Sequence, residues 1–270
     1  MMSPVLRMEG VFNIRDLGGI ATSDGRRIAP GRLYRSASLH EMTDTDRSAF
    51  ERLGIGTVID LRSHWERGRQ PYSLEGARMV NAPLVTDERM AAIVARFDGG
   101  TLTSDEVEDW WTFAGVYQTP EEHLEAMRIV FDEFVGVPPG EAILFHCRGG
   151  KDRTGLIAAL LLEALGVPRA GIVWDFLLSN GASDDVAATE DFARLTAVLG
   201  RSGLSRRAIE AMTGVEEDWL QTLLAGICSR YGSVRSYLAD TVGIGEPGLK
   251  RLRENYLEPP DGERSPQPKI

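Results

Sequence analysis

Short apolar runs alternate with amphipathic segments in the first part of the chain, and amphipathic segments dominate after about residue 150. Runs rich in apolar and β-branched residues predict strands over 33–36, 56–61, 78–84 and 142–145. Strands that alternate with helices, followed by helices, indicate an α/β sheet with a helical C-terminal portion. Apolar residues three or four positions apart predict helices over 43–53, 121–135, 185–199, 205–212, 216–231, 234–240 and 246–257.

Local signals set several boundaries. Thr43 is the predicted N-cap of the first helix, because Asp46 follows at the capping-box position and Gly54 lies past the helix end. No break in composition demands a second domain, so residues 1–260 are predicted to form a single domain. Residues 261–270 are polar and proline-containing and are predicted to form a disordered tail.

Composition narrows the classes of function. The chain has 270 residues, of which 43% are hydrophobic and 26% charged, as in ordinary globular proteins. A net charge of −10 makes nucleic acid an unfavourable partner. No apolar stretch approaches a membrane span, and residues 1–10 lack the apolar core of a secretory signal. Two cysteines form no disulfide framework, so a reducing cytoplasm is expected, with signal-independent secretion left open.

The candidate chemistry is concentrated in residues 146–155, which read HCRGGKDRTG. Cys147 follows a short apolar run and therefore lies where a buried strand ends and a helix begins, the position at which open α/β sheets bind ligands. Backbone N–H groups and the positive end of the helix dipole converge there, which makes an anion site and favours a thiolate. The apolar face of that helix is predicted to comprise Leu156, Ile157, Leu160, Leu161 and Leu165.

Arg153 lies six residues after Cys147 and adds a permanent charge with a two-pronged donor set. A tetrahedral oxyanion held between Arg153 and the loop amides would present its central atom to the sulfur, which suits in-line attack on phosphorus. Thr154 can donate a hydrogen bond to the sulfur when it is expelled. An inert core cysteine would not need these neighbours. The other phosphate-binding positions are Arg148, Gly149, Gly150 and Lys151.

The order His-Cys, five residues, Arg, Thr resembles the signature loop of cysteine-dependent protein phosphatases. Its fuller form, HCxxGKDRTG, is similar to that of the atypical bacterial tyrosine and lipid phosphatases of the mycobacterial phosphatase B type. The resemblance runs from about Asn13 to about Tyr256. It includes NIRDLGG at 13–19 (with Ile14 where Phe is usual), GRLYRS at 31–36, DLRS at 60–63, YGS at 231–233 and YL at 237–238.

This resemblance implies a cysteine-phosphatase fold, in which helices flank a mostly parallel central sheet. It also implies a phosphatase that acts on phosphotyrosine, with phosphoserine, phosphothreonine and phosphoinositides as further candidate substrates, and that needs no metal or other cofactor. Lys151 would contact the extra phosphates of a lipid head group, or is a solvated lysine at the loop edge. Residues 85–119 would form a helical lid over the site, or an ordinary insertion whose aromatic residues are core.

The general acid has several candidates. The resemblance implies Asp152, which would protonate the leaving oxygen and later deprotonate water, whereas the residues alone also allow it to cap the following helix. Asp60 is the second candidate, and its alternative role is a salt bridge with Arg62 or Arg153. Asp105 and Asp109 lie where other cysteine phosphatases carry an acid, without the familiar sequence around them.

His146 is expected to orient the loop by hydrogen bonding, and as the only histidine near a cysteine motif it argues against a metal site. Two other functions remain as alternatives. A rhodanese-like sulfurtransferase also places a cysteine in an anion-binding loop after a strand, but its active loop has a different length. A non-catalytic phosphate-binding module would lack the cysteine or the arginine.

Overall fold

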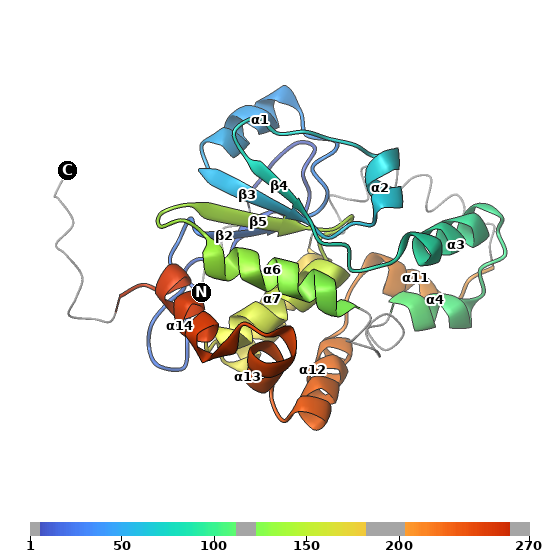
Figure 1. The fold of residues 1–270 in the computed structure, drawn as a ribbon. Helices are drawn as coiled ribbons and strands as arrows, with labels where there is room; N and C mark the ends of the chain where they lie inside the picture. The colour runs from blue at the N-terminus through green and yellow to red at the C-terminus, as the bar shows by residue number, and fades with distance from the viewer. Residues whose placement is uncertain (1–5, 112–122, 182–202, 260–270) are drawn as a thin grey trace.

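The sheet of the protein has five strands in the order β1-β2-β5-β3-β4 (Figure 1). The structure, a computed structural model, describes residues 6–111, 123–181 and 203–259. Every neighbouring pair of strands is parallel except β1 and β2, so the prediction of a mostly parallel sheet is confirmed. The strands are β1 (Arg15–Asp16), β2 (Leu33–Ser36), β3 (Ile55–Asp60), β4 (Arg78–Asn81) and β5 (Ala142–His146).

Helices cover both faces of the sheet (Figure 1). In that view α1 lies above the strands, and α6 and α7 lie below them. The α-helices are α1 (Asp44–Glu51), α2 (His64–Arg69), α3 (Asp87–Asp98), α4 (Ser104–Trp111), α6 (Leu124–Gly136), α7 (Asp152–Ala164), α8 (Arg169–Leu177), α11 (Arg206–Thr213), α12 (Glu217–Tyr231), α13 (Val234–Ser236) and α14 (Gly245–Tyr256). A 3₁₀ turn, η2 (Leu178–Asn180), and a π-helix, η3 (Tyr237–Val242), complete the described elements.

Alternate side chains of the central strands pack into different cores, because neighbouring residues of a strand point to opposite faces. Val58 and Leu144 join Phe50 of α1 in the core above the sheet. Ile59 and Phe145 lie in the larger core on the other face. A strand buried on both faces has no polar side to present, which is why β5 reads as an apolar run and β3 as a mainly apolar and β-branched one.

Helix α7 is buried more completely than its sequence pattern predicts. The predicted apolar face from Leu156 to Leu165 is buried, but Ala158, Ala159 and Leu162 between these positions are buried as well. The helix contacts the sheet and also α8, α13 and α14, so it has no solvent-facing side along its middle. Helix α7, which follows the candidate loop, is therefore held in place by the centre of the core.

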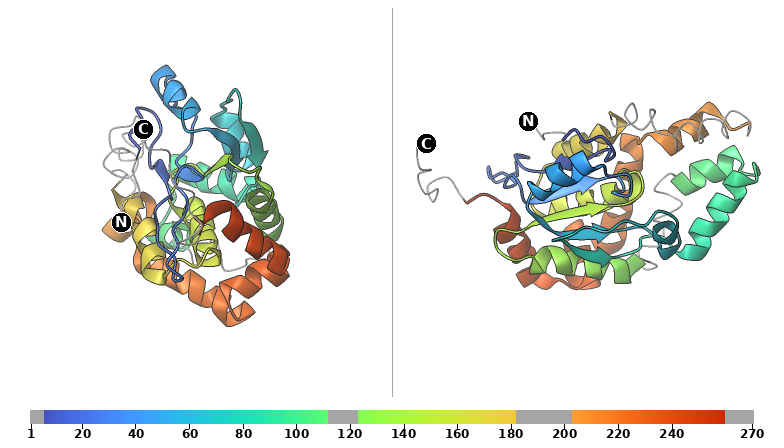
Figure 2. Two further views of the ribbon diagram at one scale, coloured as in Figure 1. Left: turned by 90° about the vertical axis from the view of Figure 1, so that its left-hand side faces the viewer. Right: turned by 90° about the horizontal axis from the view of Figure 1, so that it is seen from above.

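The carboxyl end of the parallel strands is flanked by α3, α4 and α11 (Figures 1 and 2). Helices α4 and α11 pack through a small separate core of Leu102, Val107, Ala208 and Met212. Within the segment 85–119, the described part is helical, as both alternatives for it require. Residues 112–119 and the side chains of Trp110 and Trp111 lie outside what is described, so the choice between a lid and an ordinary insertion stays open.

Most predicted elements are confirmed, with shifts of a few residues at their ends. The capping box of Thr43 and Asp46 is present at the start of α1. Helix α2 was not predicted, because its six residues, HWERGR, are polar and show no apolar periodicity. The predicted helix over 185–199 and the tail over 261–270 lie outside the described residues. No helix in the described ranges is long and apolar enough to cross a membrane.

Candidate active site

The candidate loop joins the central strand β5 to α7, as the sequence predicts. Cys147 follows β5 directly and is 2% exposed. Gly150 has a left-handed φ of 67°, and a Cβ atom there would lie 2.5 Å from the backbone of Ser36. Only glycine allows this close approach, by which the loop packs against the end of β2. The Ser38 amide also donates a hydrogen bond of 2.9 Å to the Arg148 carbonyl.

The guanidinium of Arg153 is held by Glu66 of α2 in a two-pronged ion pair. Nη1 and Nη2 of Arg153 donate to Oε2 and Oε1 of Glu66 over 2.7 and 2.8 Å. Burial opposes the charged form of Glu66, but the charge and hydrogen bonds of Arg153 outweigh it and lower its pKa below 4.5. A carboxylate that grips both Nη atoms fixes the plane of the guanidinium.

Glu66 was not among the predicted site residues, although the sequence contains a signal for it. Ser63 and Glu66 form the capping box of α2, with reciprocal hydrogen bonds of 3.1 and 2.9 Å. The spacing Ser-x-x-Glu, which begins at the last residue of the DLRS motif, is the signature of such a box. Glu66 therefore both caps the start of α2 and orients Arg153.

A second group of polar side chains lies under the loop, on the side of β1, β2 and α8. Arg35 donates to the Gly150 carbonyl over 2.8 Å, and Asn13 donates to the same oxygen over 2.9 Å. Both are buried, as are Arg15 and Asp175 beside them. Asn13, Arg15 and Arg35 belong to motifs that carry the family resemblance, and Asp175 was missed because its only sequence signal is a lone charge in an apolar helix.

His146 is fully buried, and its hydrogen bonds define its tautomer. Nδ1 lies 2.9 Å from the Cys147 carbonyl oxygen, which can only accept, so Nδ1 carries the proton. Nε2 then accepts from the hydroxyl of Tyr72 over 2.5 Å. Burial lowers the pKa of His146 below 6.5 despite the nearby Asp60, and burial raises the pKa of Tyr72, so both groups are neutral near pH 7. This arrangement agrees with the predicted orienting role of His146.

Asp60, the second candidate acid, is bound to Arg62. It is 2% exposed and accepts from the Arg62 side chain at 2.9 to 3.2 Å and from the Arg62 amide at 2.9 Å. Burial would raise the pKa of Asp60, but His146 and Arg62 lower it below 3.8. A carboxylate that stays ionised has no proton to donate near pH 7, so the salt-bridge alternative fits the geometry better.

Lys151 and Asp152 form an ion pair of 2.8 Å at the start of α7. The Lys151 ammonium also donates to the carbonyls of Ala211 and Gly214, over 3.2 and 3.0 Å, at the C-terminal end of α11. This site suits a cation, because helix C-termini carry partial negative charge. Asp152 is the first residue of α7, and the N-cap, Lys151, makes no side-chain capping bond, so Asp152 does not take the capping alternative.

The remaining predicted residues are Thr154, Arg148, Asp105 and Asp109. Thr154 is buried, and its hydroxyl has no hydrogen-bond partner among the described residues. Arg148 is exposed at the loop surface. Asp105 lies near the start of α4, and the side chain of Asp109 is outside the described set.

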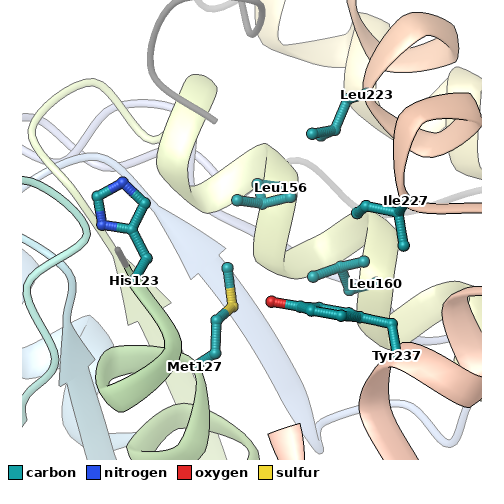
Figure 3. Close-up of a pocket in the computed structure, with 7 residues that line it drawn as sticks. All are labelled: His123, Met127, Leu156, Leu160, Leu223, Ile227 and Tyr237. Carbon is teal, nitrogen blue, oxygen red and sulfur yellow. The ribbon is translucent and has the colours of Figure 1, made fainter. Parts of the chain in front are cut away.

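A separate cavity begins one turn along α7 from Arg153 (Figure 3). Its walls are mainly apolar, and no lysine, arginine or carboxylate of the described ranges lines it, so this lining does not suit a phosphate group. The lining residues are His123, Met127, Leu156, Leu160, Leu223, Ile227 and Tyr237.

A cysteine and an arginine on one strand-to-helix loop, at the carboxyl end of a parallel sheet, define the class of cysteine-dependent phosphatases. Comparison with known proteins agrees. The model of the tyrosine phosphatase family matches residues 6–258, and the chain belongs to that family.

Named relatives fall in the same class. A protein of Cupriavidus necator, which carries a provisional tyrosine-protein phosphatase name, is 31% identical over 255 residues, 93% of this chain and 88% of its own. The triple specificity protein phosphatase PtpB of Mycobacterium tuberculosis is 29% identical over 279 positions, 92% of this chain and 98% of its own. A crystal structure of P. aeruginosa TpbA covers 74% of this chain and 90% of its own, but at 17% identity and a TM-score of 0.29 it adds nothing to the assignment.

Proposed function

We propose that this phosphatase hydrolyses phosphotyrosine through a cysteinyl-phosphate intermediate. The proposal rests on the position of Arg153. Arg153 lies on the loop that begins with Cys147, and Glu66 of α2 holds its guanidinium in one orientation. Because a guanidinium has five N–H donors, its two bonds to Glu66 are compatible with binding of phosphate oxygens. The loop amides would bind the remaining phosphate oxygens.

In the first step the Cys147 thiolate attacks phosphorus, the S–P bond forms and the P–O bond to the tyrosine breaks. The leaving oxygen takes a proton from Asp152. In the second step water attacks phosphorus, Asp152 accepts a proton from this water, and the S–P bond breaks. Inorganic phosphate is released and the Cys147 thiolate is restored. Arg153 offsets the phosphoryl charge in both transition states, and Thr154 would donate to the departing sulfur.

Asp152 is favoured as the acid by the surroundings of the two loop-side carboxyl groups. Asp60 is buried and chelated by Arg62, whereas the Asp152 side chain is 26% exposed at the loop. A proton donor for a bound substrate must reach the site, and among these two only Asp152 lies at its surface.

A comparison of leaving groups tests this assignment. Asp152→Asn should lower kcat/KM for phosphotyrosine on the order of 100-fold, because phenolate leaves poorly without a proton, and should lower kcat/KM for an activated nitrophenyl phosphate much less. The comparison uses kcat/KM because this ratio reports the first step, whereas the second step, which Asp152 also assists, is common to both substrates. Asp60→Asn is the matched control and should affect both substrates equally. Equal losses for both substrates in Asp152→Asn, with orthovanadate inhibition retained, would transfer the acid role elsewhere.

The substrate range is proposed to extend to phosphoserine, phosphothreonine and phosphoinositides. The name of the M. tuberculosis relative states triple specificity. Exposed Arg148 and the partly buried Lys151 place two further cations on the loop. Lys151 would have to exchange its bond to Asp152 or to α11 for a second phosphate of the substrate.

One panel of substrates tests the proposal. The wild-type protein should release phosphate from a phosphotyrosine peptide in the presence of a chelator, and Cys147→Ser should release none while still binding phosphate. A phosphoserine peptide and a water-soluble phosphoinositide measure the range. A Cys147→Ser protein with near wild-type rates would contradict the mechanism.

A further inference from the structure

Asp175 of α8 lies between two arginines that come from different strands. Its Oδ1 accepts from Nε of Arg15 over 2.8 Å, and its Oδ2 accepts from Nη1 of Arg35 over 2.5 Å. The Asp175 backbone carbonyl accepts a further bond of 2.8 Å from Arg15. All three side chains are 1% exposed or less. The carboxylate therefore fixes both guanidinium groups in a site buried from bulk solvent.

Both arginines act on the phosphate loop, one directly and one through Asn13. Arg35 donates to the Gly150 carbonyl over 2.8 Å, and Arg15 donates to the side-chain oxygen of Asn13. With its oxygen engaged in this way, Asn13 presents its amide to the loop and donates to the carbonyls of Gly150 and Gly149 over 2.9 and 3.3 Å. Asn13 has a φ of 54°, a conformation that asparagine tolerates better than most residues.

The Gly150 carbonyl is thereby held by two donors on the buried side of the loop. A peptide unit is planar, so a carbonyl that points inward directs the N–H of the same unit, that of Lys151, the opposite way. Gly150 can adopt the required positive φ of 67° and the close contact with Ser36. The buried donors therefore hold the Gly150 carbonyl away from the anion site. Without them, this peptide would be free to turn its carbonyl oxygen toward a bound phosphate.

The charges of this group do not cancel. Two guanidinium groups share one carboxylate, which leaves one net positive charge under the loop. Burial, followed by repulsion from Arg15, lowers the pKa of Arg35 to about 10, while Asp175 and Cys147 oppose that shift. Without the carboxylate two like charges would face each other in a buried site, and their contact with Gly150 and Asn13 would not be maintained.

We propose that Asp175 is a positioning residue for catalysis, which acts through Arg15, Arg35 and Asn13 to hold the phosphate loop in its anion-binding form. Asp175 does not contact the substrate. This inference rests on the proposed phosphatase function, since its consequence is the affinity of the loop for a phosphoryl group.

The test compares Asp175→Asn, Asn13→Gly and a control, Asp16→Asn. Glycine tolerates the positive φ of residue 13. The substitution removes the side-chain amide that donates to the loop carbonyls, together with the oxygen that accepts from Arg15. Asp16 is also a buried carboxylate, within the NIRDLGG motif, and it accepts hydrogen bonds from the amides of Gly18 and Gly31. Each variant is measured well below its own Tm, for kcat and KM on a phosphotyrosine peptide and for inhibition by orthovanadate.

Asp175→Asn is expected to lower kcat/KM on the order of 100-fold, since misplacement of a binding group by about 1 Å has this effect, and to weaken orthovanadate inhibition. Asn13→Gly should lose less in the same direction, and Asp16→Asn should stay close to the wild type in both. A folded Asp175→Asn with wild-type kcat and orthovanadate affinity would overturn the proposal, as would an equal loss in Asp16→Asn.

If Asp175→Asn does not fold, Asn13→Gly decides the question, and unchanged orthovanadate affinity in that variant rejects the proposal. The proposed function fails separately, because it requires phosphate release by the wild-type protein. An active wild type with unaffected variants rejects only the positioning role.

Discussion

The two sides of the phosphate loop use the same pair of groups, a carboxylate and a guanidinium, for different purposes. On the side of α2, Glu66 grips Arg153, whose side chain is 12% exposed and lies at the mouth of the site. On the side of α8, Asp175 grips Arg15 and Arg35, which are buried and hold loop backbone through Asn13 and Gly150.

The difference shows how burial decides what an ion pair can do. At the mouth, Arg153 is partly exposed to solvent, and in the proposed mechanism its guanidinium also binds phosphate. Under the loop, the guanidinium groups have no access to ligand, and their bonds stabilise a backbone conformation instead. Loss of the first pair should mainly affect binding and catalysis, whereas loss of the second should affect folding as well.

The largest expected effect is at the mouth. Arg153→Lys keeps the charge but loses the two-pronged contact with both Glu66 and phosphate. We expect kcat on a phosphotyrosine peptide to fall on the order of 10³-fold, the loss typical of a removed transition-state donor, with little change in Tm. Steady-state kinetics and a thermal melt check this, and a kcat within a few-fold of wild type would show that Arg153 does not bind the reacting group.

A direct comparison of the two carboxylates comes next. Asp175→Asn leaves two buried guanidinium groups without their shared carboxylate and should reduce the free energy of unfolding by about 3 kcal/mol or more. Glu66→Gln keeps a hydrogen-bonding side chain in a less enclosed pair and should reduce it by only about 1 kcal/mol. Urea denaturation of both proteins measures the difference. Equal losses would contradict the distinction between the two sides.

The buried carboxylates and His146 should affect the free energy of unfolding in different pH ranges. The pKa values of Glu66, Asp60 and Asp175 are below their usual ranges, so the stability they contribute is present above about pH 4 and is lost as pH falls further. The pKa of His146 is lowered by burial, so below about pH 6.5 the unfolded chain takes up a proton that the folded protein excludes. Stability should therefore begin to fall below about pH 6.5, by at most about 1.4 kcal/mol per pH unit from this residue.

Denaturation midpoints measured from pH 8 to pH 3 test this order of events. His146→Asn should lose the decrease that begins near pH 6.5 and keep the steeper decrease below about pH 4. An unchanged upper stage in that variant would mean that another group is responsible for it.

The smallest effect concerns Tyr72, which shares a hydrogen bond with His146. Tyr72→Phe leaves Nε2 of His146 without this donor and should reduce the free energy of unfolding by about 1 kcal/mol. Because the bond acts on the histidine and not on Arg153, kcat should change less than in Glu66→Gln. A larger catalytic loss in Tyr72→Phe would mean that His146 takes part in the reaction and does more than orient the loop.

The central part of the site was predictable from sequence because it is local. Cys147, Arg153 and the loop amides lie within one strand-to-helix turn, and the spacing of the motif determines their chemistry. Glu66 was predictable in principle, since its capping box is visible in the sequence, although its partner was not. The roles of Asp175 and Tyr72 depend on contacts between residues up to 160 positions apart, which only the fold brings together.

Elements with strong apolar patterns were also predictable, because the pattern is visible within the segment itself. The pattern of β3 and β5 reports burial on both faces, whereas α2 is polar and depends on its capping box and on the ion pair of Glu66. The full burial of α7 was underestimated because alanines between its leucines do not mark a helix as central.

The most direct test of the account is identification of the phosphorylated residue during turnover. Asp152→Asn, in which release of phosphate should be slowed, is mixed with a nitrophenyl phosphate, quenched within the first turnover and analysed by peptide mass spectrometry. The account predicts one phosphoryl group on Cys147, formed together with a burst of nitrophenol equal to the enzyme present, and none in the double variant that also carries Cys147→Ser. A phosphoryl group on another residue, or full turnover without Cys147, would contradict it.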